Sequence, residues 1–291
     1  MIVRLVGSEM CIRDSDGCME ITMLGTGSPI PDANRAAPAA LVKAGDTHIL
    51  LDAGRGVVMR MTAAGSLPGM LGGVLITHFH SDHIAALNDV ITTHWVMTQE
   101  NATLKIFGPE GIVELVDRTL AMLEFDIGYR IAHHDEMTKG PQLDVTELKP
   151  GDSFMINDVM VTTAATEHPP VSPTIGYRLE HDGVSVALVG DTNPCDGVDV
   201  LAAGADAYLQ SVIRKDLVRQ IPMEMIQDIL DYHSDVVEAA QTAARVGAKR
   251  LMLTHMVPAP PAEQYDAWVA LAAEHFDGEI ILGDDLTTVS I

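Results

Sequence analysis

The chain has 291 residues, with 41 acidic against 18 basic residues and a net charge of −23. Such a surface repels polyanions, because nucleic-acid affinity rests mainly on Lys and Arg side chains that neutralise phosphates; the longest basic cluster, IRKDLVR at 213–219, is typical of a solvated helix face. The composition therefore argues against a nucleic-acid partner, and no apolar run reaches the roughly 18 residues that a membrane span needs.

The first fifteen residues do not show the pattern of a folded segment. RLVGSEMCIRDS, at 4–15, resembles the translation of a sequencing adapter fused to a gene fragment, so we predict that residues 1–15 form a non-native, disordered leader. A native leader is the alternative. Because the true start is either Met19 or lost upstream, the missing signal peptide gives only weak support for a cytoplasmic location, and a periplasmic one stays open. Removing the leader's two acidic and two basic residues leaves 39 acidic against 16 basic.

Residues 16–291 are predicted to form a single α/β domain, because the length suits one large core and no low-complexity linker interrupts it. Cys18 and Cys195 lie too far apart in sequence to suggest a disulfide framework or a thiolate zinc site. In the first half, apolar runs and turn residues predict strands at 20–25, 39–45, 48–54, 73–78 and 104–109, and helices at 56–65, 83–98 and 111–125.

The second half repeats this plan. Strands are predicted at 160–168, 175–181, 184–191, 250–255, 279–284 and 286–291, and helices at 222–231, 234–246 and 264–276. Strand runs with helices after them in both halves favour two sheets packed face to face with helices outside.

LITHFHSDHIAAL, at 75–87, places three histidines and an aspartate within six residues directly after a buried strand. In an extended segment, residues two apart point the same way, so His78 and His80 can approach one ion. Asp82 and His83 then open a helix and face a neighbouring point. This spacing favours two metal ions over one, the alternative being a helix N-cap at Ser81 and Asp82 with incidental histidines.

THFHSDH resembles the HxHxDH signature of the metallo-β-lactamase fold superfamily. The resemblance extends over nearly all of 20–291, through LGTGSP (24–29), LLDAGRG (50–56), EHPPV (167–171), LVGDT (188–192) and LTHM (253–256). It implies a four-layer αββα sandwich of two mixed sheets, with two divalent ions, zinc first and Mn²⁺ or Fe²⁺ as alternatives. It further implies one ion on His78, His80 and His168, the other on Asp82, His83 and His255, and a bridge through Asp191.

Each remaining candidate has a plainer alternative. Asp191 could only cap a turn, although a bridging ligand must be a negatively charged oxygen donor, which Asp supplies. We expect Asp52 to support a ligand histidine. His233 resembles the histidine that ribonuclease Z-like members place near the scissile phosphate, and could equally be a helix-flanking residue beside a Ser234 cap. Among the other histidines, we predict His48, His181 and His275 to be surface residues, whereas His94 and His133 are candidates to line the pocket and His134 has no support.

Two neighbouring divalent ions favour hydrolysis by a bridging hydroxide without a side-chain nucleophile. With His233, Asp82 and Asp191 as catalytic residues, we expect an enzyme, a metal-dependent hydrolase of small phosphoesters or sulfate esters, with promiscuity toward phosphodiesters, phosphotriesters, arylsulfates or lactones. The motifs most resemble the ribonuclease Z and arylsulfatase branch. The segment 175–192 runs straight from strand to strand, however, with no room for the basic arm of the tRNA-processing enzymes. Together with the charge, this predicts a small-molecule ester as partner and no nucleic acid.

Three alternatives remain at this point: a lactonase or β-lactam hydrolase, an iron-dependent dioxygenase, and a non-catalytic metal-binding module. The sequence leaves the oligomeric state open, with a homodimer as one option.

Overall fold

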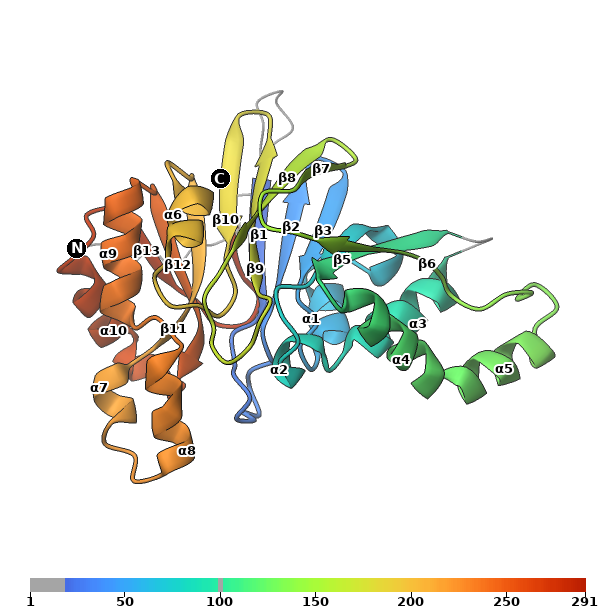
Figure 1. The fold of residues 1–291 in the computed structure, drawn as a ribbon, viewed down its shortest axis with the longest axis horizontal. Coiled ribbons are helices and arrows are strands. Elements are labelled where there is room, and N and C mark those ends of the chain that lie inside the picture. Colours follow the sequence, from blue (N-terminus) through green and yellow to red (C-terminus); the bar gives the residue numbers. More distant parts are fainter. Residues whose placement is uncertain (1–18, 99–101) are drawn as a thin grey trace.

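Two seven-stranded β-sheets lie face to face at the centre of the protein (Figure 1). The structure, a computed structural model, describes residues 19–98 and 102–291, so the predicted leader at 1–15 lies outside the described residues. The first sheet has the order β14-β1-β2-β3-β4-β5-β6. Its strands are β1 (Met19–Gly25), β2 (Ala39–Ala44), β3 (Thr47–Leu51), β4 (Leu71–Leu75), β5 (Thr103–Pro109), β6 (Gln142–Leu148) and β14 (Thr287–Ser290).

The second sheet has the order β13-β12-β11-β10-β9-β8-β7. Its strands are β7 (Ser153–Ile156), β8 (Val159–Ala165), β9 (Ile175–His181), β10 (Val184–Leu188), β11 (Ala207–Ile213), β12 (Arg250–Val257) and β13 (Glu279–Leu282). Each sheet is mixed, since β3 to β6 and β10 to β13 pair in parallel while the remaining neighbours are antiparallel.

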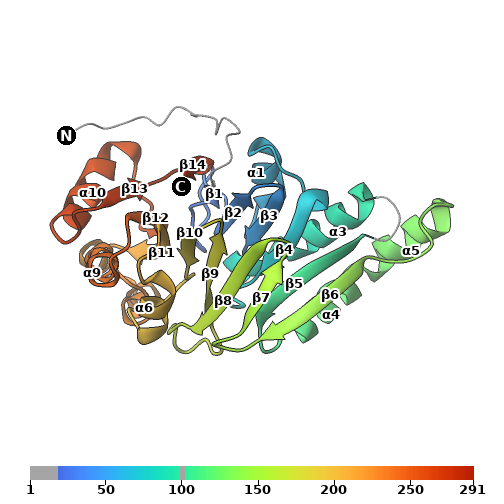
Figure 2. The same ribbon diagram turned by 90° about the horizontal axis from the view of Figure 1, so that it is seen from above.

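Helices cover the outer face of each sheet, on opposite sides of the molecule in Figure 2. The helices of the first half are α1 (Val57–Ala63), η1 (Pro68–Met70), α2 (Ser81–Ile84), α3 (Leu87–Met97), α4 (Ile112–Met122) and α5 (Glu124–His133). Those of the second half are α6 (Asp196–Ala202), α7 (Lys215–Val218), α8 (Glu224–Gln227), η2 (Asp228–Asp231), α9 (Val236–Val246), η3 (Ala262–Gln264) and α10 (Tyr265–Ala273). None of the helices in 19–98 and 102–291 is long and apolar enough to cross a membrane.

Three apolar layers hold the sandwich together. Alternate strand residues, among them Ile21, Leu51 and Leu188, fill the space between the two sheets. Tyr177 belongs to this layer, and its hydroxyl donates to the carbonyl oxygen of Ile76 at 2.7 Å, which links the second sheet to the first. Two further clusters join the outer sheet faces to α1, α3 and α4 on one side and to α6, α9 and α10 on the other. The predicted αββα sandwich is confirmed.

Several predicted elements differ in detail. The helix predicted at 83–98 is divided into α2 and α3, because the backbone N–H of Ala86 donates to the Ala53 carbonyl at 2.9 Å and the His83 carbonyl accepts from Ala53 N–H at 2.7 Å. These bonds to the neighbouring loop replace helical ones. The segment 222–231 forms only the short α8 and a 3₁₀ turn, and the sequence pattern missed β6, β7, β11, α5, α6 and α7.

Strands β9 and β10 form a tight hairpin, as predicted from the sequence. His181 pairs with Val184 across a turn in which Asp182 and Gly183 both have positive φ. No insertion separates the two strands. A different projection is present on the first half, where α5 extends away from the body beyond α4 (Figure 1). Helix α5 buries none of its residues and leaves Phe125 and Tyr129 74% and 69% exposed.

Candidate metal centre

The predicted ligands meet at one end of the sandwich, where strands of both sheets give way to loops. His78 and His80 follow β4, α2 holds Asp82 and His83, and His168 lies in the loop after β8. Two further ligands are Asp191, in the turn after β10, and His255, on β12. His80 is partly buried and the other six are at most 4% exposed, so the cluster is enclosed by the protein.

Asp191 lies at the centre of the cluster. Its Oδ2 is 3.2 Å from His83 Nε2 and 3.3 Å from His255 Nε2, and it is 4.0 Å from Nε2 of both His78 and His168. Side-chain donor atoms within 4.8 Å of one another form three groups. Two of them match the predicted ion sites, His78, His80, His168 and Asp191, and separately Asp82, His83 and His255, while the third joins His233 to Asp191 and His255. This geometry fits a carboxylate shared by two ions.

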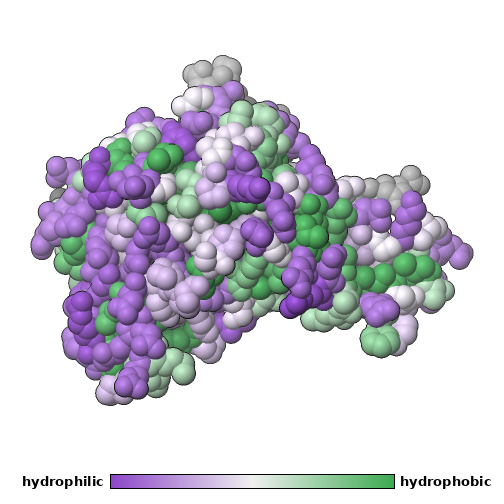
Figure 3. Space-filling model, viewed as in Figure 1, coloured by the Kyte–Doolittle hydropathy of each residue, from purple (hydrophilic) through white to green (hydrophobic). Residues whose placement is uncertain are grey.

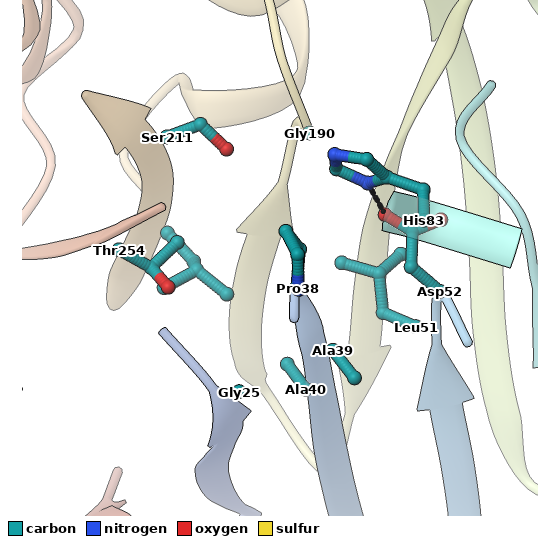
Figure 4. A pocket seen from close by; sticks show the side chains of 11 residues that line it. Gly25, Pro38, Ala39, Ala40, Leu51, Asp52, His83, Gly190, Ser211 and Thr254 are labelled. Carbon is teal, nitrogen blue, oxygen red and sulfur yellow. Dashed lines mark hydrogen bonds and ion pairs between the residues drawn. The ribbon is translucent and has the colours of Figure 1, made fainter. Parts of the chain in front are cut away.

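Asp52 fixes the orientation of two ligand histidines. Its Oδ2 accepts from Nδ1 of His83 at 2.7 Å, the contact drawn in Figure 4, and from the Thr77 hydroxyl at 3.0 Å. Because the Thr77 proton is directed at Asp52, the Thr77 oxygen is free to accept from His78 Nδ1 at 2.9 Å. Both rings therefore direct Nε2 into the cluster. The supporting role expected for Asp52 agrees with these contacts, while the role of Thr77 was not anticipated, although it directly precedes His78.

A third ligand is oriented from the other half of the chain. Nδ1 of His168 donates to the Tyr232 carbonyl at 2.8 Å, so Nε2 of this ring carries a lone pair in place of a proton. This Nε2 is only 3.1 Å from His80 Nδ1. Two ring nitrogens at this distance need a proton or a cation between them. In addition, His78 Nε2 and Asp191 Oδ1 are buried and have no hydrogen-bond partner among the described residues. The donor set therefore fits divalent ions, which would satisfy these atoms.

Burial and charge separate the two groups of histidines. Burial lowers the pKa of His168 to about 4 and holds the pKa of His78 well below its usual range, so both rings are neutral. Burial also opposes the charged form of His83, but the carboxylates of Asp191 and Asp52 outweigh it and raise the pKa of His83 well above the ordinary value. Burial would raise the pKa of Asp191, yet His255 and His83 hold it well below the ordinary value.

The backbone is unusual at two of these positions. Asp52 and His255 have φ of 55° and 53°, in the left-handed region that residues other than glycine seldom adopt. Strain of this kind persists where the surrounding structure fixes it, and it gathers at functional sites. A small cavity of about 20 Å³ lies behind the ligands, and its lining includes Asp52, His83, Ser211 and Thr254 (Figure 4).

His233 lies beside the predicted ligands rather than on the surface. Its Nε2 is 3.4 Å from Asp191 Oδ2, and its Nδ1 is 3.2 Å from the Ile229 carbonyl. Both ring nitrogens thus face oxygen atoms that can accept hydrogen bonds. His233 is 6% exposed, and its ring lies 4.8 Å from that of His168.

The other histidines lie outside the cluster. His275 is exposed, as predicted, but the prediction is wrong for His48, which is buried and pairs with Ser66 at 2.8 Å, and for His181, which pairs with Asp158 at 3.0 Å and is mostly covered. His94 is buried on α3 and His133 is exposed at the end of α5, and neither belongs to the donor groups.

Comparison with known proteins agrees with this geometry. The chain belongs to the metallo-β-lactamase fold family, since residues 47–256 match the family described as "Beta-lactamase superfamily domain". The structure of the metallo-beta-lactamase fold protein YhfI from Bacillus subtilis has the same fold, with a TM-score of 0.73 and 21% identity, covering 95% of this chain and all of that one. Human tRNase Z, short form, aligns with a TM-score of 0.68 and 22% identity over 93% of this chain and 98% of its own.

Sequence relatives place the chain in the ribonuclease Z-like branch of this family. A protein of Mycobacterium bovis (strain BCG / Pasteur 1173P2) named "Ribonuclease Z" is 52% identical over 275 residues, covering 94% of this chain and 98% of the relative. Another with that name, from Mycolicibacterium gilvum (strain PYR-GCK), is 50% identical and covers 94% and 96%. The chain is thus a metal-dependent hydrolase of a family whose clustered histidines and aspartates bind divalent ions.

These relatives overturn two predictions, the small-molecule ester substrate and the exclusion of nucleic acid. Arylsulfatase and phosphotriesterase activities have no support among them. Both errors have a physical reason. Net charge sums the whole surface, whereas two divalent ions would add four positive charges at the site itself. The absence of a basic arm at 175–192 does not separate this chain from proteins named ribonuclease Z either. Those relatives align with it over 96–98% of their own length, which leaves no room in them for a long insertion.

Proposed function

We propose that this protein is a ribonuclease Z that hydrolyses a phosphodiester bond in precursor tRNA with two divalent ions, zinc first and Mn²⁺ or Fe²⁺ as alternatives. The similarity to relatives with that name supports the substrate class. The observation that carries the proposal is the convergence of the seven predicted ligands, with Asp191 at their centre and His233 3.4 Å from the same carboxylate.

In this proposal, two sets of side chains would each bind one ion, and His233 would carry the proton for the leaving group. His78, His80 and His168 would bind one ion, and a second set would bind the other: Asp82, His83 and His255. Asp191 would bridge them. When bound, such a pair activates water and stabilises the charge that develops on the phosphate.

The remaining side chains orient these groups. Asp52 and the Tyr232 carbonyl hold the Nδ1 protons of His83 and His168, so that each Nε2 is available as a ligand atom. His233 would donate the proton on Nε2 to the leaving ribose oxygen, since no other histidine outside the ligand set approaches Asp191 among the described residues. A cytoplasmic location, which the sequence weakly favours, and a homodimer, which the sequence leaves open, are both compatible with this substrate.

The test is cleavage of a labelled precursor tRNA, extended at both ends, by protein of measured metal content. We expect a single cut that separates the mature tRNA from one extension. The variant His78→Ala should lose this activity together with metal. His275→Ala is the matched control, because that histidine is exposed and outside the cluster, and it should behave as the unaltered protein.

An unaltered protein with two bound ions that leaves the precursor intact would refute the proposed function. Cleavage that persists after chelation, or in His78→Ala, would refute the assigned site instead.

A further inference from the structure

The two residues after Asp191 connect the other segments of the site. The backbone N–H of Glu167 donates to the Thr192 hydroxyl oxygen at 2.9 Å, and Asn193 N–H donates to the Glu167 carbonyl at 2.8 Å. These bonds fix the segment that contains His168. The turn after β10 thereby fixes the position of His168 relative to the predicted bridging carboxylate, Asp191.

The same two residues also hold the segment on either side of His233. On one side, Asn193 Nδ2 donates to the Asp231 carbonyl at 2.8 Å. On the other, Ser234 donates twice to the Thr192 carbonyl, from its N–H at 2.9 Å and from its hydroxyl at 2.8 Å. His233 is thus bracketed by bonds that end one or two residues from Asp191.

The His233 ring makes few other polar contacts, although it lies 4.8 Å from the rings of His168 and Tyr232. Its bond to the Ile229 carbonyl is 3.2 Å long and stays within the same short segment, so it cannot set the distance between His233 and Asp191. That segment also packs on an apolar cluster around Ile213, Val218 and Val257. Two further bonds reach it, from Ile213 N–H to the Ser234 carbonyl at 3.0 Å and from His168 Nδ1 to the Tyr232 carbonyl at 2.8 Å. The bonds of Thr192 and Asn193 are the ones that connect the backbone around the predicted proton donor to the turn that contains the predicted bridge.

We propose that Asn193 and Ser234 are positioning residues that hold His233 at the distance from Asp191 required for proton transfer to the leaving oxygen. The inference rests on the proposed function. Its physical basis is that a displacement of about 1 Å from productive geometry costs about 10²-fold in rate. Both side chains act through His233 and neither is assigned as a metal ligand.

The test uses Asn193→Ala and Ser234→Ala on substrates that differ in leaving group. For precursor tRNA, and for a phosphodiester with an alkyl leaving group, kcat should fall about 10–100-fold with little change in KM. For bis(p-nitrophenyl) phosphate the loss should be below about 3-fold, because nitrophenolate needs little protonation. Ser234→Thr, which keeps the hydroxyl, should recover most of the loss.

Two measurements exclude a merely structural effect. Metal content should stay at the level of the unaltered protein, and long-range ¹H–¹⁵N spectra of the metal-free variants should show the His233 ring signals broadened or shifted, with those of His168 retained. Gln227→Ala is the matched control. Gln227 lies at the end of α8, shortly before His233 in the chain, and its side chain donates to the Ile221 carbonyl at 3.0 Å without bonding to residues 191–193. It should leave the ratio between the two diesters unchanged.

An equal loss on both diesters, unchanged activity, or a loss explained by missing metal would overturn the positioning role. If the unaltered protein does not cut tRNA, the proposed function fails, while the two small diesters and the spectra still decide the positioning of His233.

Discussion

Asp52→Asn isolates the hydrogen bond that orients His83. Asn has the shape of Asp and tolerates the left-handed region, so φ of 55° at this position is kept without new strain. The amide oxygen can still accept from the Thr77 backbone N–H, which is 2.9 Å from Asp52 Oδ1. The amide NH₂ then faces His83 Nδ1, a donor in place of an acceptor.

Either orientation of the amide leaves a mismatch. If NH₂ donates to His83 Nδ1, the ring proton moves to Nε2, the atom that would bind the ion. If the introduced amide is flipped, its NH₂ group faces the Thr77 N–H, which is also a donor. Two buried donors in opposition cost about 1–3 kcal/mol, or about 2–4 °C in Tm for each kcal/mol in a chain of this size. Loss of a supporting bond of this kind typically costs about 10–100-fold in metal affinity.

The assay is titration of metal-free protein with zinc against a chromogenic chelator, together with thermal unfolding. We expect the ion assigned to His78, His80 and His168 to bind nearly as in the unaltered protein, because the Thr77 hydroxyl can still donate to the Oδ1 position at 3.2 Å. The ion assigned to His83 should bind about 10–100-fold more weakly. Asp158→Asn is the matched control, because Asp158 also accepts from a threonine, Thr47 at 2.8 Å, and from a histidine, but lies at the surface. Two ions bound with unaltered affinity in Asp52→Asn would refute the orientation argument.

Three further predictions concern the ions and the RNA. Asp191→Ala should lower the content of both ions, as measured by mass spectrometry of the dialysed protein, and retention of one full equivalent would show that Asp191 does not bridge. As pH falls, the ion on His83 should be released at higher pH than the ion on His168, because carboxylates raise the pKa of His83 whereas burial lowers that of His168 to about 4; metal content across a pH series checks the order, and the reverse order would contradict it. Ten of the 16 basic residues outside the leader form ion pairs with carboxylates, and much of the surface in Figure 3 is hydrophilic. We expect about two of the remaining basic residues to contact phosphates, so tRNA binding measured by filter retention should weaken only roughly 10–20-fold for a fourfold rise in KCl. A loss above about 10³-fold would show that a larger basic surface contacts the RNA.

The local pattern of the sequence was sufficient to predict most strands and to recognise the metal-binding motif. Apolar runs bounded by turn residues identify β1, β2 and β3, because these strands are buried on both faces. His78 to His83 could be assigned to a metal site because all four donors lie within six residues at a strand end. Later ligands needed the family resemblance, since an isolated histidine before two prolines has no pattern of its own.

Only the tertiary structure decided the elements whose sequence pattern is ambiguous. Strand β11 is buried along its whole length although it contains Gln210 and Ser211, and these polar residues are accommodated because Gln210 bonds the Ser211 carbonyl at 2.7 Å and the Tyr208 hydroxyl. The break between α2 and α3 comes from bonds to Ala53, thirty residues earlier in the chain. Neither feature has a local cause.

The same division holds for the site. The sequence by itself determined which residues could bind metal, because ligand chemistry belongs to the side chain. It did not determine that His233 would face Asp191, or that Thr192 and Asn193 would hold it there, because those positions depend on hydrogen bonds between segments about 40 residues apart. The substrate predicted from net charge was wrong for a related reason. Substrate binding depends on the electrostatic field at one enclosed site, and the fold decides where that site lies by bringing Asp191 and the surrounding histidines together.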